Sequence, residues 1–424
     1  MTTALLLVGL ALLGTPLFVV IALSAFLGFA ATDTDLMAVA VEFYRLAEMP
    51  ILLAIPLFTF AGYLLSESGA PARLVELTEA LLGWMPGGLA VVALVACALM
   101  TAFTGASGVT IVALGALLYP ALKQAGYPED FNLGLLTSAG SLGVLFAPAL
   151  PLILYAVVVQ QMGVGEPFTV DDMFTAGLLP GLLMVALMAA YSMWVGRGRP
   201  LTPFRWQRAR RALWQARWEL PLPVLVLGGI YSGLFAVSEA AAVTALYVLV
   251  VEVLVLREIP LGRLPAVIRE SMTLVGAILV ILGVSLASTN YLIDAEVPER
   301  LFEWVNARVS DPLAFLILLN LFLLVLGTLL DVFSALMIVV PLMVPVALGY
   351  GIDPVHLGIV FLANMQIGYF TPPVGMNLFI ASHRFGKPVL QLYRATLPFF
   401  FILLGAVLII TYWPALSLGL LGRG

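Results

Sequence analysis

The ten residues GYFTPPVGMN, at positions 368–377, place two adjacent prolines between glycines inside an otherwise apolar stretch. Proline has no backbone N–H and its ring collides with the preceding helical turn, so an α-helix is expected to break here. Lipid cannot satisfy the backbone N–H and C=O groups that such a break leaves unpaired. If this segment lies in a membrane, protein or water must therefore face the break.

The composition indicates that the chain does lie in a membrane. Of its 424 residues, 62% are hydrophobic and 10% are charged, with a mean hydropathy of +1.11. Soluble proteins average about 45–50% apolar and about 25% charged residues, so these charges are too few to cover a soluble surface. The single cysteine, Cys97, excludes an intramolecular disulfide and a thiolate metal cluster. The only Gly-Lys pair lies in FGKP, outside any nucleotide-binding motif, and no catalytic triad or zinc motif is present. Direct ATP use and enzyme activity are therefore not expected.

Apolar segments of about 20 residues are long enough to cross a bilayer. Two segments, 89–123 and 312–348, instead contain two shorter apolar arms around a polar break, TGASG or LDVFS. We interpret both as re-entrant hairpins; the alternative is a pair of ordinary spans joined by a tight turn. The remaining segments, each predicted to span, are 4–30, 47–66, 131–161, 174–195, 219–236, 238–256, 271–289, 354–382 and 395–414.

Charges in the loops predict the orientation, because basic loops tend to stay in the cytoplasm. This rule places the N-terminus inside and the C-terminus outside, with hairpin 89–123 entering from the cytoplasm and hairpin 312–348 from the external side. The basic loops are 197–218, 257–270 and 382–394, and the acidic ones are 31–48, 162–173 and 290–311.

The stretch 197–218 carries seven arginines with interleaved tryptophans. Next to membrane spans, this pattern favours an amphipathic helix on anionic lipid. A nucleic-acid-binding segment is the weaker alternative, and we expect no nucleic-acid partner.

Two distant stretches share the same order of breaks. GSLGVLFAPALPLILYAV (140–157) and NMQIGYFTPPVGMNLFIA (364–381) align Pro148 with Pro372 at an offset of 224 (372 − 148). Each follows a predicted hairpin, and the connecting span at 219–236 makes the second copy enter from the opposite side. Inverted repeats with broken helices are typical of secondary transporters that bind substrate near the bilayer midplane.

The predicted fold is therefore an all-α polytopic membrane protein with inverted repeats, two re-entrant hairpins and two broken helices. The first repeat covers 1–196, with hairpin 89–123 and broken helix 131–161. Residues 197–236 form a basic cytoplasmic amphipathic linker and a connecting span. The second repeat covers 237–424, with hairpin 312–348 and broken helix 354–382.

A helix interrupted in mid-membrane offers N–H groups that attract anions and C=O groups that attract cations. Hydroxyl, amide and carboxylate side chains gather at the predicted breaks, and such hard oxygen ligands suit Na⁺ or a polar substrate. Asp331 stands out because an ionisable group at membrane depth is costly and usually functional. Ser107 and Asp331 have an alternative role as helix N-caps. The candidates are Thr104, Ser107 and Thr110 at the first tip, Thr328, Asp331 and Ser334 at the second, Ser141 in the first broken helix, and Asn364, Gln366, Thr371 and Asn377 in the second.

Three further residues have simpler interpretations. Glu239, near the external start of a span, is either a first-turn carboxylate or part of a contact with a partner. His356 and His383 lack metal-ligand spacing and are predicted to be interfacial residues in or near loops.

An inside-negative membrane potential opposes the entry of an organic anion by about 2.3 kcal/mol per charge per 100 mV. Uptake of a dianion therefore needs co-transported cations.

Four stretches closely resemble the large membrane subunit of tripartite ATP-independent periplasmic (TRAP) transporters. They are MPILLAIPLFTFAGYLLSESG, PGGLAVVALVACALMTAFTGASG, GGIYSGLFAVSEAAAV and TPPVGMNLFIAS, spread over about residues 45–385. The resemblance implies a multi-pass inner-membrane, Na⁺-driven importer of organic acids that works by an elevator motion and has no cofactor besides the coupling ion. It also implies two partners, a small four-helix membrane subunit and a periplasmic substrate-binding protein.

The resemblance also extends the predicted sites. The first sodium site would combine the tip Thr104–Gly108 with the break Gly140–Ala149, and the second Leu330–Ser334 with Gly368–Gly375. This adds Gly105, Gly140, Phe146, Pro148, Gly368 and Pro372 to the ion-site candidates. Substrate binding is assigned to Ser107, Thr110, Asn364, Gln366, Gly375 and Asn377.

The chain departs from the family pattern at two places. Ala147, Pro148 and Ala149 stand where the family usually has proline-proline-serine, so a hydroxyl ligand is missing there. Residues 236–238, Ala-Val-Ser, replace a common threonine-proline-threonine before Glu239.

Two other functions compete with this one: a stand-alone sodium/anion symporter of similar fold, and an intramembrane enzyme or structural subunit. Transport by the chain alone would favour the first, and an absence of Na⁺-dependent flux the second.

Overall fold

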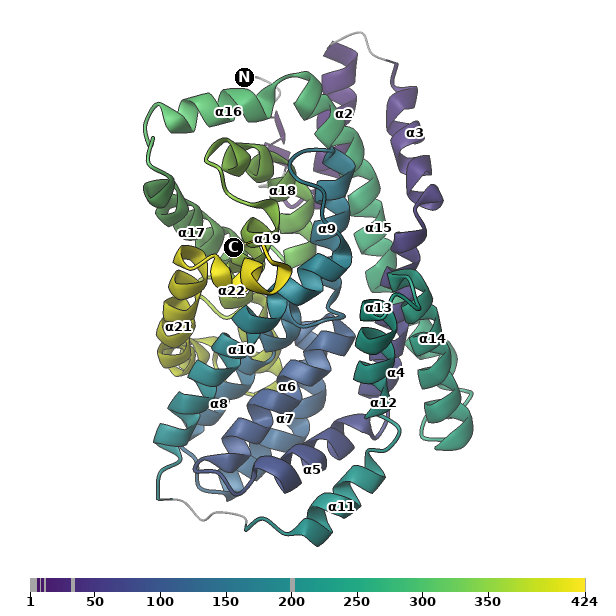
Figure 1. The fold of residues 1–424 in the computed structure, drawn as a ribbon, viewed down its shortest axis with the longest axis vertical. Helices are drawn as coiled ribbons and strands as arrows, with labels where there is room; N and C mark the ends of the chain where they lie inside the picture. The colour runs from purple at the N-terminus through teal and green to yellow at the C-terminus, as the bar shows by residue number, and fades with distance from the viewer. Residues whose placement is uncertain (1–5, 8, 11–12, 32–34, 199–202, 424) are drawn as a thin grey trace.

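The computed structural model describes residues 6–7, 9–10, 13–31, 35–198 and 203–423. Within them the fold is entirely helical, without a β-strand (Figure 1). The helices are α2 (Leu17–Ala31), α3 (Met37–Arg45), α4 (Ala54–Glu67), α5 (Ala70–Leu82), α6 (Gly88–Thr104), α7 (Ser107–Gln124), α8 (Glu129–Ala139), α9 (Leu150–Met162), α10 (Val170–Val195), α11 (Trp206–Gln215), α12 (Pro221–Pro223), α13 (Gly229–Tyr231), α14 (Val237–Leu249), α15 (Leu264–Asp294), α16 (Val297–Asn306), α17 (Pro312–Leu329), α18 (Val332–Gly349), α19 (Pro354–Gly368), α20 (Met376–Phe385), α21 (Val389–Tyr412) and α22 (Ala415–Leu418).

The described residues contain seven helical runs long and apolar enough to cross a membrane, or eight if the bent pair α8–α9 forms one span. The prediction of a polytopic membrane protein is therefore confirmed. Two predicted spans differ in extent. In the span 4–30 the main helix is α2, which begins only at Leu17, and residues 1–5, 8 and 11–12 lie outside the described part. The connecting span 219–236 contains helix only from Pro221 to Tyr231, with a π-helical turn at Val224–Gly228, and ends near Gly233, whose φ is +73°.

Both predicted hairpins are present as antiparallel helix pairs. α6 and α7 are joined by Gly105 and Ala106, and Gly105 adopts φ +65°, a left-handed conformation that glycine tolerates. α17 and α18 are joined by Leu330 and Asp331. These two arms have 18 residues each, long enough by themselves to span, so length does not distinguish a re-entrant hairpin from two ordinary spans. The distinguishing feature is that the second tip packs against the break between α19 and α20.

Both predicted helix breaks are present as well. α8 continues through a 3₁₀ turn at Leu142–Leu145 and is bent by 43° against α9. α19 ends at Gly368 and α20 begins at Met376, so the GYFTPPVGMN stretch contains the predicted interruption. The Ala147-Pro148 and Pro372-Pro373 peptide bonds are cis.

Two groups of helices lie side by side in Figure 1. α4 packs against α14 and α15, and α15 packs against α2 and α3. The hairpins and the broken helices pack with α10 and α21 into the larger group. Two amphipathic helices join the groups: α5 links α4 to the first hairpin, and α16 links α15 to the second. α5 lies at the lower end of the view and α16 at the upper end.

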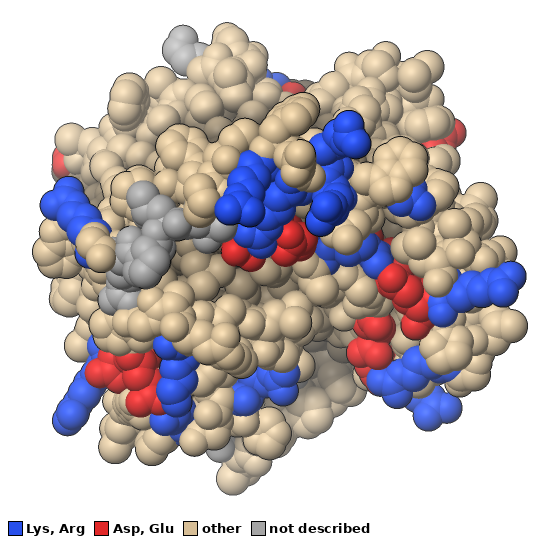
Figure 2. All heavy atoms as spheres, turned by 90° about the horizontal axis from the view of Figure 1, so that it is seen from below, with Lys and Arg blue, Asp and Glu red and all other residues tan. Residues whose placement is uncertain are grey.

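The lower end carries a network of ion pairs, and Figure 2 looks directly at it, with basic and acidic side chains clustered over the surface. Arg73 of α5 contacts Glu219, Glu252 and Glu258, which ties α5 to the segments before α12 and before α15. Burial would raise the pKa of Glu258, but hydrogen bonds from Arg73 and from the backbone N–H of Gly69 lower it overall. Residues 203–218 of the first basic loop and the basic loop 257–270 thus lie at one end of the molecule, as expected if this end faces the cytoplasm.

Candidate functional site

The two hairpin tips and the two helix breaks meet at the centre of the larger helix group. Ser107, the first residue of α7, donates a hydrogen bond of 2.7 Å to Oδ1 of Asn377 in α20. The Asn377 Nδ2 donates to the Thr137 carbonyl of α8 at 3.2 Å, and its backbone N–H donates to the Tyr369 carbonyl. Asn377 is fully buried. One side chain of the second broken helix therefore binds both the first tip and the first broken helix.

A second cross-connection joins the two broken helices directly. The Ser141 hydroxyl, at the end of α8, lies 3.2 Å from the Gln366 carbonyl of α19. On the other side of this break, the Thr101 hydroxyl donates to the Gly140 carbonyl at 2.7 Å and lies 2.7 Å from the Thr110 hydroxyl. Both arms of the first hairpin are thereby fastened to the first break.

The second tip is fastened to the second break mainly through the backbone. The Gly375 N–H donates to the Thr328 carbonyl at 3.0 Å, and the Val332 N–H donates to the Tyr369 hydroxyl at 2.8 Å. Gly368 and Gly327 touch: a Cβ on Gly368 would lie 2.5 Å from the Gly327 Cα. Only glycine allows the arm of the hairpin and the end of α19 to approach this closely.

The structure supports the capping interpretation of Asp331. Its Oδ1 accepts hydrogen bonds from the Phe333 and Ser334 N–H groups at 3.0 and 3.1 Å, and its Oδ2 accepts from the Ser334 hydroxyl. This is the arrangement of an N-cap, with the carboxylate also placed at the positive end of the α18 dipole. Ligation of an ion by Asp331 remains a prediction.

Several other candidates already have hydrogen-bond partners of their own. The Thr328 hydroxyl donates to the Val325 carbonyl of its own helix α17, and the Thr371 hydroxyl, inside the break, donates to the Ile367 carbonyl of α19, at 2.8 Å each. Thr104 folds over the first tip, with its hydroxyl 3.4 Å from the Ala106 backbone groups. Such hydroxyls satisfy the backbone at a helix end, and their lone pairs remain open to a cation.

Two amide candidates on α19, Asn364 and Gln366, have different surroundings. The Asn364 Nδ2 donates to Oδ1 of Asn320 at 2.7 Å, inside the packing of α19 against α17. The Gln366 side chain is fully buried, and neither its Oε1 nor its Nε2 has a hydrogen-bond partner within the described residues. Unpaired buried amides are costly, so this site has the capacity to bind water or a ligand.

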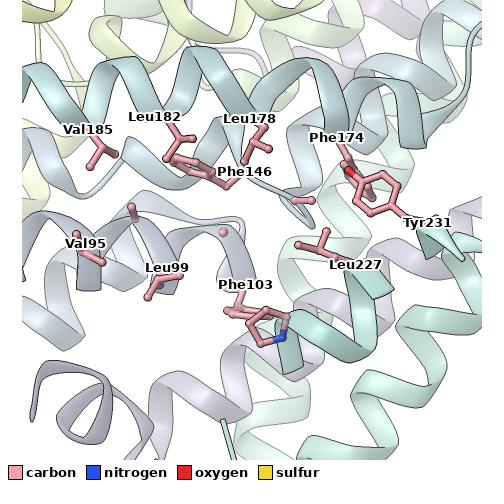
Figure 3. A pocket seen from close by; sticks show the side chains of 14 residues that line it. Val95, Leu99, Phe103, Phe146, Phe174, Leu178, Leu182, Val185, Leu227 and Tyr231 are labelled. Carbon is pink, nitrogen blue, oxygen red and sulfur yellow. The ribbon is translucent and has the colours of Figure 1, made fainter. Parts of the chain in front are cut away.

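Phe146 lies in an apolar environment. Its ring lines a cavity of about 300 Å³ between α6, α10 and the segment from α12 to α13, together with Leu99, Leu182 and Leu227 (Figure 3). Of this residue only the backbone carbonyl can face an ion, and that carbonyl already accepts from the Ala149 N–H at 2.9 Å.

The expectation for His356 is wrong. The residue is 3% exposed in the first turn of α19, and its ring contacts the Ser417 hydroxyl at 2.7 Å and the Thr411 carbonyl at 3.2 Å. Glu239 is a first-turn carboxylate: its Oε2 accepts from the Ala236 N–H at 2.9 Å.

Thr101, Thr137 and Tyr369 were not singled out as site residues, although Tyr369 lies inside the predicted segment Gly368–Gly375 and each contributes a hydroxyl or a carbonyl to the centre. Thr101 lies one helical turn before the first tip, and Tyr369 lies inside the GYFTPPVGMN break. Position beside a break was therefore the signal that could have found these two, whereas nothing local distinguishes Thr137, which contributes a backbone carbonyl.

Structurally, the chain is similar to a transporter from Alcanivorax borkumensis called YdaH, whose crystal structure is described as having an unusual topology. The TM-score is 0.65 at 15% sequence identity, covering 90% of this chain and 88% of that one. This likeness supports the fold.

The sequence comparisons identify the family. The family model "Tripartite ATP-independent periplasmic transporter, DctM component" matches residues 3–416. The C4-dicarboxylate TRAP transporter large permease protein DctM of Pseudomonas aeruginosa is 36% identical over 90% of this chain and 89% of its own length. The ectoine/5-hydroxyectoine large permease UehC of Ruegeria pomeroyi is 30% identical over 96% and 95%. These relatives are transport permeases rather than enzymes, and the chain belongs to the DctM family of large, multi-pass inner-membrane subunits of TRAP transporters.

Proposed function

We propose that this subunit imports a small organic acid together with sodium ions by an elevator motion, after a periplasmic binding protein delivers the acid. The observation that carries the proposal is the centre at which both tips and both breaks are bonded to one another, through Ser107–Asn377, Ser141–Gln366 and Gly375–Thr328. Such a centre concentrates helix ends and backbone dipoles in one place, and these attract both an anion and its coupling cations.

The substrate class is supported by the relatives. Their names refer to C4-dicarboxylates, isethionate, ectoines and sialic acid, all of which are small polar compounds with an acidic group. We therefore propose a small organic acid, with a C4-dicarboxylate as the first compound to assay.

Sodium coupling is supported by the chemistry of the centre. The groups nearest the tips are hydroxyl, carbonyl and amide oxygens, with Asp331 as the carboxylate. In the described residues, no cluster of His, Cys, Asp and Glu is suited to a transition metal. Hard oxygen donors of this type suit an alkali cation.

Membership of a tripartite transporter family supports two proposed protein partners, a small membrane subunit and a periplasmic binding protein. A relative from Oleidesulfovibrio alaskensis, the isethionate permease DctMQ, is longer than this chain, which covers 59% of it. The extra length of that relative is consistent with a second membrane component beside the large subunit.

An anionic lipid surface is a further proposed partner. On α11, Trp206 and Trp214 are 66% and 69% exposed, and Arg210 and Arg211 are exposed between them. Residues 199–202 of this basic stretch lie outside the described part. Exposed tryptophans and arginines on one short helix support attachment to anionic headgroups.

Proteoliposomes containing both membrane subunits test the function. With the binding protein outside and an inward sodium gradient, labelled succinate is expected to accumulate, and replacement of sodium by potassium is expected to abolish the accumulation. Equal uptake without the binding protein would instead support a stand-alone symporter. Sodium-independent uptake would refute coupling.

A further inference from the structure

Two adjacent cavities lie beside α7, the second arm of the first hairpin. The first, of about 660 Å³, lies between α7 and the helices α4 and α15, and Arg269 of α15 lines it. The second, of about 530 Å³, is lined by residues of α20, among them His383 and Arg384. Val112 and Ile380 line both cavities, so the two are immediate neighbours. Each has a volume typical of a small-molecule site.

The first cavity lies beside the centre described above. Gly108, which lines it, directly follows Ser107, and Ile380 lies three residues after Asn377. A Cβ on Gly108 would lie 2.7 Å from the Ile380 Cδ1, so α7 and α20 are in close contact at this point. The Ser107–Asn377 hydrogen bond therefore lies next to the inner end of the cavity.

Of the charged side chains that line the two cavities, only some form ion pairs. Glu67, which lines the first cavity, forms an ion pair with Arg263, with 3.1 Å between the Glu67 Oε2 and the Arg263 Nη2. Neither the Arg269 nor the Arg384 guanidinium makes an ion pair or a hydrogen bond within the described parts of the chain, and both residues are exposed. The first cavity is also lined by Glu270, an exposed residue whose carboxylate makes no hydrogen bond or ion pair within the described residues.

We propose that the two cavities form one release path for the transported acid, and that Arg269 and Arg384 contact its carboxylate on the way to the cytoplasm. This rests on the proposed function for the nature of the cargo, but not for the existence of the path. An anion leaving the centre passes between a cation on α15 and a cation on α20. Unpaired cations in a cleft raise the local concentration of anions and speed their passage.

The path can be tested without knowing the substrate, by thiol labelling. The native chain has one cysteine, Cys97, which is 1% exposed, whereas Val112 is 46% exposed and lines both cavities. In a Val112→Cys protein in inside-out vesicles, an anionic methanethiosulfonate reagent is expected to react faster than its cationic counterpart. Adding Arg269→Gln or Arg384→Gln is expected to lower the anionic-to-cationic rate ratio by at least about threefold.

Two further variants act as controls. Arg257→Gln removes an exposed arginine of the preceding loop that lines neither cavity, and is expected to leave the ratio unchanged. Arg269→Lys keeps the charge and is expected to restore most of the ratio. An unchanged ratio in both the Arg269 and the Arg384 variants would overturn the proposal, as would labelling from the external face only.

A second measurement connects the path to transport. In proteoliposomes with all three components, Arg269→Gln and Arg384→Gln are expected to lower the maximal rate of sodium-driven succinate uptake at least about threefold, with Arg257→Gln at the wild-type rate. If the wild-type protein shows no sodium-driven uptake, the proposed function fails while the labelling result still decides the path. Altered labelling with a normal rate of uptake would overturn the role of the arginines in release.

Discussion

The hydrogen bond between Ser107 and Asn377 joins residues 270 positions apart and is the most direct test of the centre. Asn377→Ala removes two buried side-chain bonds, one to Ser107 and one to the Thr137 carbonyl. At about 0.5–1.5 kcal/mol each, the expected loss in the free energy of unfolding is about 1–3 kcal/mol. Ser107→Ala removes only the shared bond, for an expected loss of about 0.5–1.5 kcal/mol.

The double variant distinguishes the shared bond from two independent losses. The Ser107–Asn377 bond can be lost only once. The sum of the two single losses in the free energy of unfolding is therefore expected to exceed the loss in the double variant by about 0.5–1.5 kcal/mol. Unfolding of the purified protein in mixed detergent micelles, followed by circular dichroism, measures all three variants. Thr244→Ala serves as the control partner, since the Thr244 hydroxyl bonds only to its own helix α14, and its effect is expected to add to that of Asn377→Ala.

Additivity of Ser107→Ala and Asn377→Ala to within about 0.3 kcal/mol would show that the two side chains do not interact, and would refute the cross-bonded centre. Repeating the cycle in sodium chloride and in choline chloride extends the test. If sodium binds at the first tip, it stabilises the wild-type protein by mass action, and this stabilisation is expected to shrink in both variants.

Three further predictions concern the second tip and the charged end. Asp331→Ala is expected to cost about 0.5–2 kcal/mol by removing the cap of α18; Asp331→Asn, which keeps an acceptor, is expected to recover the stability but not the sodium activation of uptake. Gly368→Ala is expected to cost about 1–3 kcal/mol by pushing α17 away at Gly327; Gly405→Ala, with no atom within 4 Å of the new Cβ, is expected to cost nothing, and thermal unfolding compares them. The pKa of Glu258 is lowered in the folded protein, so its contribution to stability is present above the unfolded pKa and is expected to be lost as the pH falls through the folded value; unfolding measured against pH checks this, and Glu258→Gln should flatten that part of the curve.

The elements of the fold could be predicted from the sequence because local chemistry determines them. The predicted hairpins 89–123 and 312–348 correspond to helix pairs over 88–124 and 312–349, and broken helices 131–161 and 354–382 to 129–162 and 354–385. Prolines, glycines and short polar groups inside apolar runs end helices wherever they occur. The clearest difference is the segment 219–236, where hydropathy suggested a full span and Gly233 ends the helix early.

The partners within the site could not be predicted in the same way. Nothing near Ser107 in the sequence points to Asn377, and nothing near Asn364 indicates that its amide faces Asn320 on α17 rather than the break. Such contacts depend on how distant helices pack, which a local pattern does not encode. Asp331 illustrates the limit: the sequence left open a cap and an ion ligand, and the observed hydrogen bonds establish the cap alone.

The distribution of hydrogen bonds also bears on which parts can move. Separating the two breaks from the tips would leave several buried groups without partners, at about 1–3 kcal/mol for each. Sliding the larger helix group, which contains the hairpins and the broken helices, along α13 and α15 would break fewer hydrogen bonds. Water can replace the bond to the exposed Tyr231 of α13, at a cost of about 0.5–1.5 kcal/mol. At Gly62, α4 approaches the backbone of the first tip closely, since a Cβ there would lie 2.5 Å from the Phe103 carbonyl oxygen. This distribution supports the proposed elevator motion, in which the hairpins and broken helices would move as one body past α4 and α15, the boundary along which the first cavity lies. The bonds inside that body are Ser107–Asn377, Ser141–Gln366 and Gly375–Thr328, and those across its boundary are Ser285–Met337 and Thr175–Tyr231.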